Sequence, residues 1–336
     1  SMRAIVVEKP GSISLAERPA PEAPAPGWVT VDIARVGICG TDYHIYEGKH
    51  PFLAYPRVIG HELSGTVAID GEGWTAGTRV IINPYVACGT CHACLRGKPN
   101  CCMRIGVLGV HRDGGLCERI NVPAINLIAA GDLDEEAAAT VEFLAIGAHA
   151  VRRSGLGPSD RVLVVGAGPI GLGAALFARR RGAELHLVDA SAERLAMVAE
   201  RFGFANTHVA GDPAALVASA AGGDGFDAVF DATGNPRAMQ ASFGYLAHGG
   251  SCVMVGVVPD DITFNDAEFH KREATLFASR NATSEDFATV VAALADGGID
   301  HRKLITHRTT MEDLPGVMAE WVRDRSSLIK AMVRVA

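Results

Sequence analysis

The stretch Arg161-Val-Leu-Val-Val-Gly-Ala-Gly-Pro-Ile-Gly171 runs from a short apolar segment into three closely spaced glycines. The apolar segment predicts a buried strand, and Pro169–Arg181 predicts a helix that begins inside the glycine-rich turn. The first glycine permits a tight turn, the second lets the backbone approach a pyrophosphate, and the third lets the helix pack close to the strand. The pattern predicts a dinucleotide-binding loop formed by Gly166, Gly168, Pro169, Ile170 and Gly171.

Strands and helices alternate after this loop. We expect strands at Glu184–Val188, Ala228–Phe230 and Ser251–Val255, and helices at Ala192–Phe202 and Pro236–Phe243. Such alternation is typical of a doubly wound parallel sheet with helices on both faces. The sequence therefore predicts an α/β nucleotide-binding domain.

Asp189 ends the second expected strand, near the distance along the chain at which an acidic residue accepts hydrogen bonds from the adenosine ribose. A carboxylate at this position repels a 2′-phosphate, so the sequence favours NAD over NADP as the cofactor. Arg194 has three open interpretations: it stacks on the adenine, it pairs with Asp189, or it is a solvated charge on a helix.

The N-terminal part of the chain has the alternating pattern of short strands. Strands are expected at Arg3–Glu8, Val29–Val36, Leu63–Ile69 and Arg79–Asn83, and the first long helix at Asp134–Arg153. After the nucleotide-binding segment, the expected elements are two helices and a last strand: Ser284–Ala295, Met311–Arg323 and Leu328–Val333.

These patterns divide the 336 residues into about two domains. We expect residues 1–147 to form the first part of a catalytic domain and residues 148–274 to form the nucleotide-binding domain. Residues 275–336 are then expected to return to the catalytic domain and to supply the C-terminal elements. The fold class is α/β, with one domain inserted into another.

The composition is that of an ordinary water-soluble protein, with 48% hydrophobic and 21% charged residues. The net charge of −7 argues against nucleic acid or an anionic membrane as the main partner. We find neither an apolar run of transmembrane length nor a segment like a secretory leader. We therefore expect a cytoplasmic protein that acts on a small molecule.

Four cysteines have the spacing C-x2-C-x2-C-x7-C: Cys88, Cys91, Cys94 and Cys102. This spacing predicts a closed tetrahedral zinc site in a small lobe, residues 88–102. Cys101 competes with Cys102 for the fourth ligand position. An iron–sulfur cluster is a rival, but bacterial ferredoxins use a last gap of three residues rather than seven. Eight cysteines clustered in this way favour metal binding in a reducing compartment over a disulfide framework.

A second, open metal site is indicated by Cys39, by the pair His61-Glu62 and by Glu142. A thiolate and an imidazole bind Zn2+ readily. Glycines flank Cys39 and His61, which indicates that the backbone is crowded there. Glu142 lies in an apolar helical pattern, where a carboxylate is costly to bury unless it is paired or binds a metal.

Together these motifs resemble the zinc-dependent medium-chain dehydrogenase/reductase family, and within it the sorbitol and L-threonine dehydrogenase branch. Besides the cysteine lobe and the glycine loop, the matching motifs are Cys39-Gly-Thr-Asp42, Gly60-His-Glu-x-x-Gly65, Asp113-Gly-Gly115, Glu142 and Asp231-Ala-Thr-Gly234. The resemblance spans almost the whole chain. It implies a GroES-like, mostly-β catalytic domain joined to a Rossmann domain, two zinc ions per chain, NAD as the cofactor, and a homodimer or homotetramer.

The resemblance also implies roles for individual residues. Three ligands would hold the catalytic zinc: Cys39, His61 and Glu142. Glu62 is left open as an alternative ligand or as a partner of a ligand, and it counts among the candidate catalytic residues with Thr41 and His44. Thr41 and His44 match the hydroxyl and the imidazole of a proton relay. Thr233 and Val255 are further candidate contacts to the cofactor.

In its overall sequence the chain resembles bacterial dehydrogenases that oxidise hexonates, such as L-galactonate or L-gulonate, at C5. A hexonate needs a cation for its carboxylate, and Arg280 is the first candidate, with His111 and Arg112 as others. Arg280 has a rival interpretation as a structural ion pair. Rival substrates are a neutral polyol, such as sorbitol or galactitol, and L-threonine. A rival of another class is a catalytically silent dinucleotide-binding protein on the same fold.

Overall fold

The computed structural model describes residues 1–51 and 53–336. The chain folds into two compact units: unit 1 contains Ser1–Glu142 and Thr283–Ala336, and unit 2 contains Phe143–Ala282. Unit 2 is longer at both ends than the nucleotide-binding domain expected from the sequence, residues 148–274. Its sheet gains a last strand, Thr275–Ala278, that the sequence did not reveal.

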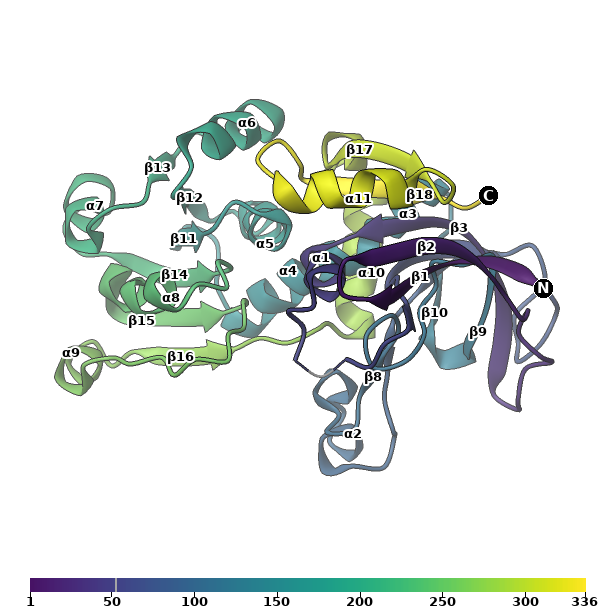
Figure 1. Ribbon diagram of the computed structural model, residues 1–336. Helices are drawn as coiled ribbons and strands as arrows, with labels where there is room; N and C mark the ends of the chain where they lie inside the picture. Colours follow the sequence, from purple (N-terminus) through teal and green to yellow (C-terminus); the bar gives the residue numbers. More distant parts are fainter. Residues whose placement is uncertain (52) are drawn as a thin grey trace. The chain divides into compact units, whose positions relative to one another are not determined.

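Unit 2 is built around a parallel sheet of six strands in the order β13-β12-β11-β14-β15-β16, which runs from top to bottom in Figure 1. The strands are β11 (Arg161–Val165), β12 (Glu184–Asp189), β13 (Thr207–Val209), β14 (Phe226–Asp231), β15 (Leu246–Met254) and β16 (Thr275–Ala278). The strand order reverses between β11 and β14. In such sheets ligands bind beyond the carboxyl ends of the strands at this point.

The helices of unit 2 connect these parallel strands, except for α4, which precedes β11. They are α4 (Val141–Ser154, which begins in unit 1), α5 (Pro169–Arg180), α6 (Ala192–Phe202), α7 (Pro213–Ala220), α8 (Pro236–Ala241) and α9 (Asp266–Lys271). The glycine loop between β11 and α5 leaves little room for a side chain at Gly166 and none at Gly171, whereas Gly168 faces open space. Gly166 has φ +102°, and a Cβ on Gly171 would lie 1.8 Å from the Gly166 carbonyl oxygen. The sequence therefore forms the tight strand-to-helix turn that it predicts.

Unit 1 is mostly β, as expected. A seven-stranded sheet has the path β10-β6-β5-β3-β18-β17 with β9 beside β3, a three-stranded sheet has the order β2-β1-β4, and β7 pairs with β8. The strands are β1 (Met2–Lys9), β2 (Ser12–Arg18), β3 (Trp28–Ile38), β4 (Arg57–Val58), β5 (Glu62–Val67), β6 (Arg79–Ile82), β7 (Tyr85–Val86), β8 (Gly106–Val107), β9 (Arg119–Pro123), β10 (Leu127–Ala129), β17 (Ile305–Thr310) and β18 (Lys330–Arg334). One apolar core joins the sheets, and its members include Ile5, Val36, Leu63 and Val333.

The helices of unit 1 are α1 (Gly40–Glu47), α2 (His92–Leu95), α3 (Glu135–Ala139), α10 (Ser284–Ala295) and α11 (Leu314–Arg323). The helix α1 was not expected from the sequence. The single helix predicted for Asp134–Arg153 was wrong, because the chain forms α3 and α4 with a break at Thr140. The Ala137 carbonyl oxygen accepts from the Thr140 hydroxyl at 2.7 Å and from the Thr140 amide at 3.0 Å, whereas in a continuous α-helix it would accept from the amide four residues further on.

Candidate active site

Three possible metal ligands meet in unit 1. The Cys39 thiol, the His61 ring and the Glu62 carboxylate each offer one ligand atom, and these atoms all lie within 4.8 Å of one another. The Cys39 Sγ lies 3.0 Å from His61 Nε2, and a Glu62 oxygen lies 3.9 Å from the same nitrogen. A thiolate, an imidazole and a carboxylate at this spacing are the donor set of an open zinc site.

Local structure brings these ligands together. Cys39 follows the last residue of β3 and caps α1, whose first turn donates toward it, and a helix N-terminus favours a thiolate. Glu62 begins β5 and pairs with Gly37 on β3. A Cβ on Gly37 would lie 2.4 Å from a Glu62 carboxylate oxygen, so only glycine leaves room for this side chain. This glycine explains the crowding that the sequence indicates beside Cys39.

Lys330 is a member of the site that the sequence did not reveal. It begins β18, and its Nζ lies 2.8 and 2.9 Å from the two oxygens of Glu62. Both side chains are fully buried. Nζ also donates to the Ile38 carbonyl oxygen at 3.0 Å. Burial alone would lower the pKa of Lys330, but the charges of Glu62 and Cys39 outweigh it and raise that pKa.

Glu142 is not among the three grouped ligands of the described residues, although the sequence suggested it as a ligand. Its carboxylate is buried, and the Tyr85 hydroxyl donates to its Oε1. It does not join the ligand group among the described residues. Burial, opposed by His61 and reinforced by Glu62, raises the pKa of Glu142 to about 7. Its assignment as a direct ligand therefore stays a prediction.

Burial also shifts the pKa values of the metal-binding groups themselves. It raises the pKa of the Cys39 thiol, with a contribution from Asp42 that the nearby His61 opposes. Burial would lower the pKa of His61, but Cys39 and Asp42 raise it further than burial lowers it. Asp42 accepts from the Cys39 amide at 3.0 Å, and its other oxygen lies 3.8 Å from His61 Nδ1.

The two residues of the suggested proton relay lie on α1, directly after Cys39. Thr41 is partly exposed and His44 is exposed. Partial burial lowers the pKa of His44, and the positive charge of Arg325 adds to this effect. An exposed imidazole one helical turn from the metal group can pass a proton to solvent.

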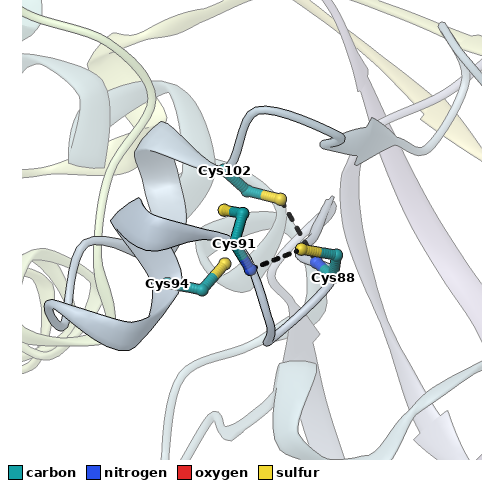
Figure 2. A group of neighbouring side chains, drawn as sticks. All are labelled: Cys88, Cys91, Cys94 and Cys102. Atoms are coloured by element: carbon teal, nitrogen blue, oxygen red, sulfur yellow. Dashed lines mark hydrogen bonds between the residues drawn. The ribbon is translucent and has the colours of Figure 1, made fainter.

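The cysteine lobe gathers four sulfur atoms around α2. The thiols of Cys88, Cys91, Cys94 and Cys102 point toward one another in Figure 2, with all sulfur atoms within 4.8 Å of one another. Cys102 is buried and belongs to this group, whereas Cys101 is exposed and does not. Backbone and hydroxyl groups of Thr90 donate to Cys88 and lower its pKa to about 5. The donor set fits a closed four-thiolate zinc site.

The expected cofactor contacts of unit 2 follow the carboxyl ends of its strands. Gly166 comes after β11, Asp189 ends β12, Thr233 follows β14 and Val255 follows β15. A Cβ on Gly166 would lie 3.3 Å from the Thr233 methyl group, so these two residues are neighbours at the point where the strand order reverses. This is where a dinucleotide binds in such sheets.

Asp189 also has a structural role in unit 2. Its carboxylate accepts hydrogen bonds from the amides of Ala167 and Ser191, each at 2.8 Å, so it connects the glycine loop to the end of β12. Each carboxylate oxygen has a second lone pair for a ribose hydroxyl. Partial burial lowers the pKa of Arg194, while the nearby Asp189 acts in the opposite sense. Its proximity to Asp189 is consistent with the pairing that the sequence left open.

None of the suggested substrate contacts belongs to the ligand group found among residues 1–51 and 53–336. Arg280 is exposed in unit 2, after β16. His111 is exposed in unit 1, and its Nδ1 accepts from the Val107 amide at 3.0 Å. The guanidinium of Arg112 lies 5.5 Å from the centre of the Trp28 ring. These substrate contacts stay predictions.

Comparisons with known proteins define the family. Residues 25–132 match the alcohol dehydrogenase GroES-like domain, and residues 169–296 match the zinc-binding dehydrogenase family. Together with the relatives below, these matches show that the chain belongs to the zinc-dependent medium-chain dehydrogenase family, as the resemblance predicted. The GroES-like and Rossmann folds, the oxidoreductase class and the use of zinc and a nicotinamide cofactor are thereby confirmed.

Individual relatives cover nearly the whole chain. The chain is 41% identical to the L-galactonate-5-dehydrogenase of Escherichia coli K12, over 99% of both proteins. It is 32% identical to the D-altritol 5-dehydrogenase of Agrobacterium fabrum, over 93% of this chain and 94% of the relative. The crystal structure of alcohol dehydrogenase RspB from E. coli CFT073 in complex with NADH superposes with a TM-score of 0.92, with 31% identity and 99% coverage of both chains.

No helix of the described residues is long and apolar enough to cross a membrane.

Proposed function

We propose that this chain oxidises a secondary alcohol of a hexonate, such as L-galactonate or L-gulonate at C5, to the ketone with NAD. The observation that carries the proposal is the meeting of Cys39, His61 and Glu62 in one open group of ligands. The substrate class is supported by the 41% identity to an L-galactonate-5-dehydrogenase over almost the full length of both proteins. We further propose that the enzyme is a cytoplasmic homodimer or homotetramer.

The two units have different roles in the proposed reaction. Cys39 and His61, with Glu62 or Glu142, would hold a zinc ion, which would supply Lewis-acid polarisation of the alcohol oxygen, and NAD would supply the hydride acceptor. The Thr41 hydroxyl would take up the alcohol proton as it releases its own proton toward His44, and the exposed His44 ring would pass a proton to solvent. In unit 2, the glycine loop binds the pyrophosphate and Asp189 binds the ribose.

The carboxylate of a hexonate needs a cation. We propose Arg280 and His111, both of which are exposed, as contacts to this carboxylate. Loss of a hydrogen bond to a charged group costs about 1.5–3 kcal/mol, so Arg280→Ala is expected to raise the KM for a hexonate about tenfold or more. The KM for a neutral polyol should not change. Arg180→Ala, at the far end of α5 from the glycine loop, is the matched control.

The test is NAD reduction by the zinc-loaded protein with L-galactonate, L-gulonate, sorbitol, galactitol and L-threonine. We expect the highest kcat/KM with a hexonate. A neutral polyol is the second candidate, because the chain is also similar to a D-altritol 5-dehydrogenase, and a higher kcat/KM for a polyol would establish it instead. Preference for L-threonine would refute both. No reduction with any of the five would point to the catalytically silent nucleotide-binding protein.

A further inference from the structure

Arg325 lies in the loop between α11 and β18 and contacts α1, the helix that carries His44. Its guanidinium carbon lies 4.8 Å from the centre of the Tyr43 ring, which is buried. Its Nη2 lies 3.5 Å from a Glu47 carboxylate oxygen. The cation–π contact and the ion pair together hold the positive charge of Arg325 against one side of α1.

His44 belongs to the same part of α1. It follows Tyr43 directly and precedes Glu47 by three residues, and side chains three residues apart are neighbours on a helix. The guanidinium that contacts both Tyr43 and Glu47 is therefore held beside the His44 ring. Burial lowers the pKa of His44, and the charge of Arg325 is the next largest cause and lowers it further.

Other charged groups around His44 have smaller effects. Glu47 raises the pKa of His44 and Lys49 lowers it, but each contributes less than the guanidinium. The Lys49 side chain is 65% exposed, so solvent screens its charge. His50 is also within electrostatic range, since burial and the charges of His111 and His44 lower its pKa. Among the residues that the structure describes, the guanidinium is therefore the main positive charge at the His44 ring.

A group that takes up a proton must be neutral beforehand. A fixed cation beside an imidazole disfavours the protonated ring, because two like charges would then face each other. We propose that Arg325 is a positioning residue for proton release, whose charge keeps the His44 ring neutral until a proton arrives through Thr41 and then favours its loss to solvent. The proposal rests on the function proposed above, in which His44 is the last group of the proton relay.

The variant Arg325→Gln tests the proposal, because it removes the charge from a partly exposed side chain. We expect the His44 ring of the zinc-loaded protein to titrate at higher pH in Arg325→Gln than in the wild-type protein. NMR of ring-labelled histidine measures this without cofactor or substrate, and the His44 signal is the one that is absent in His44→Gln. Arg325→Lys keeps the charge and should move the titration less than Arg325→Gln.

A matched control removes a cation from the same segment of the chain. Arg323 ends α11, two residues before Arg325, and its charge is not among the causes that shift the pKa of His44. Arg323→Gln should therefore leave the His44 titration unchanged. If His44 in Arg325→Gln titrates at the wild-type pH or below it, or moves no further than in Arg323→Gln, the proposal is overturned.

The pH profile of alcohol oxidation gives a second readout. At pH values where His44 is largely protonated, kcat/KM should fall about two- to fivefold in Arg325→Gln, whereas the alkaline plateau should not change. If Arg325 only packs on Tyr43, its loss will change kcat/KM by the same factor at every pH, and this result also overturns the proposal. Failure of the wild-type protein to oxidise any hexonate would refute the proposed substrate without affecting the NMR comparison.

Discussion

Lys330 and Glu62 form a fully buried ion pair at the metal group, with Nζ 2.8 and 2.9 Å from the two carboxylate oxygens. The two residues lie on opposite sides of β3, because the sheet order is β5-β3-β18. Gly37 lies between them without a side chain, so the carboxylate can reach across. The pair neutralises Glu62 while leaving it 3.9 Å from His61 Nε2. Glu62 is therefore shared between the lysine and the metal site.

Loss of the lysine should leave the Glu62 carboxylate buried without a partner. Removing one member of a buried ion pair costs about 3–5 kcal/mol, because the remaining charge is not compensated. We expect Lys330→Met, which keeps the length of the side chain, to lower the free energy of unfolding of the zinc-loaded protein by this amount. Denaturant unfolding measures it.

The chain offers a matched surface pair as the control. Lys49 lies 3.0 Å from Glu47 with its side chain 65% exposed, and exposed pairs contribute about 0–1 kcal/mol. Lys49→Met should therefore change stability little. The double variant Lys330→Met/Glu62→Gln should recover part of the loss, because no unpaired charge is left. Equal effects of Lys330→Met and Lys49→Met would refute the account.

The nucleotide unit could be predicted from local signals. The strand Arg161–Val165 and the helix Ala192–Phe202 have the bounds that the sequence predicts. Ser191 marks the start of that helix, since its side chain accepts from the Arg194 amide. The strand Thr275–Ala278 was missed because its residues are largely exposed at the sheet edge and give no buried apolar run.

The partners in the metal site could not be predicted in the same way. Cys39 and His61 lie beside glycines in recognisable motifs, but Lys330 and Tyr85 carry no local mark of function. Lys330 reaches Glu62 only because β18 lies beside β3, which is a property of the sheet order. A lysine between Ile329 and Ala331, in a run of buried residues, is the one signal that could have indicated a buried partner.

The two metal sites should be separable by substitution. Cys39→Ala removes one ligand of the open group and leaves the four-thiolate lobe intact, so we expect one zinc per chain, a folded protein and no turnover. Cys94→Ser breaks the closed lobe and should lower thermal stability, because a structural zinc contributes to folding. Metal analysis and thermal unfolding of both variants measure these outcomes. Iron–sulfur absorption in the Cys39→Ala protein would show that the lobe does not hold zinc.

Asp189 should determine the choice of nicotinamide cofactor. If the carboxylate accepts from the ribose and repels a 2′-phosphate, as proposed, Asp189→Ser should lower kcat/KM for NAD by about 10- to 100-fold. The NADP value should fall less or rise, so the ratio of the two values changes. Steady-state kinetics with both cofactors test this. A wild-type protein that uses NADP as well as NAD would contradict the assignment.

A control is needed because Asp189 also accepts from the Ala167 and Ser191 amides. Asp227 accepts from the Arg161 amide at 2.7 Å at the other end of the same sheet. Asp227→Ser should weaken the sheet without changing the ratio of the NAD and NADP values. Serine keeps a hydroxyl acceptor at both positions, so the two variants differ chiefly in what they offer the ribose.

Two histidines of unit 2 should make its stability depend on pH. His186 Nδ1 and His208 Nε2 lie 2.9 Å apart on neighbouring strands, and their rings stack with centres 5.2 Å apart. Burial lowers the pKa of both residues, and for His186 the charge of His208 lowers it further. The unfolded chain, with histidine pKa values of about 6.5, therefore binds more protons than the folded chain below that pH. Their contribution to stability is complete above about pH 6.5 and is lost as the pH falls toward the folded pKa values.

The variant His208→Gln isolates this effect from the titration of carboxylates. It removes one of the two histidines and the interaction between them, so the unfolding midpoint should fall less steeply between about pH 7 and about pH 5 than in the wild-type protein. His248→Gln replaces an exposed histidine of the same unit and should keep the wild-type slope. Denaturant unfolding at a series of pH values gives the three slopes. If His208→Gln and wild-type protein have the same slope, the pair does not couple protonation to unfolding.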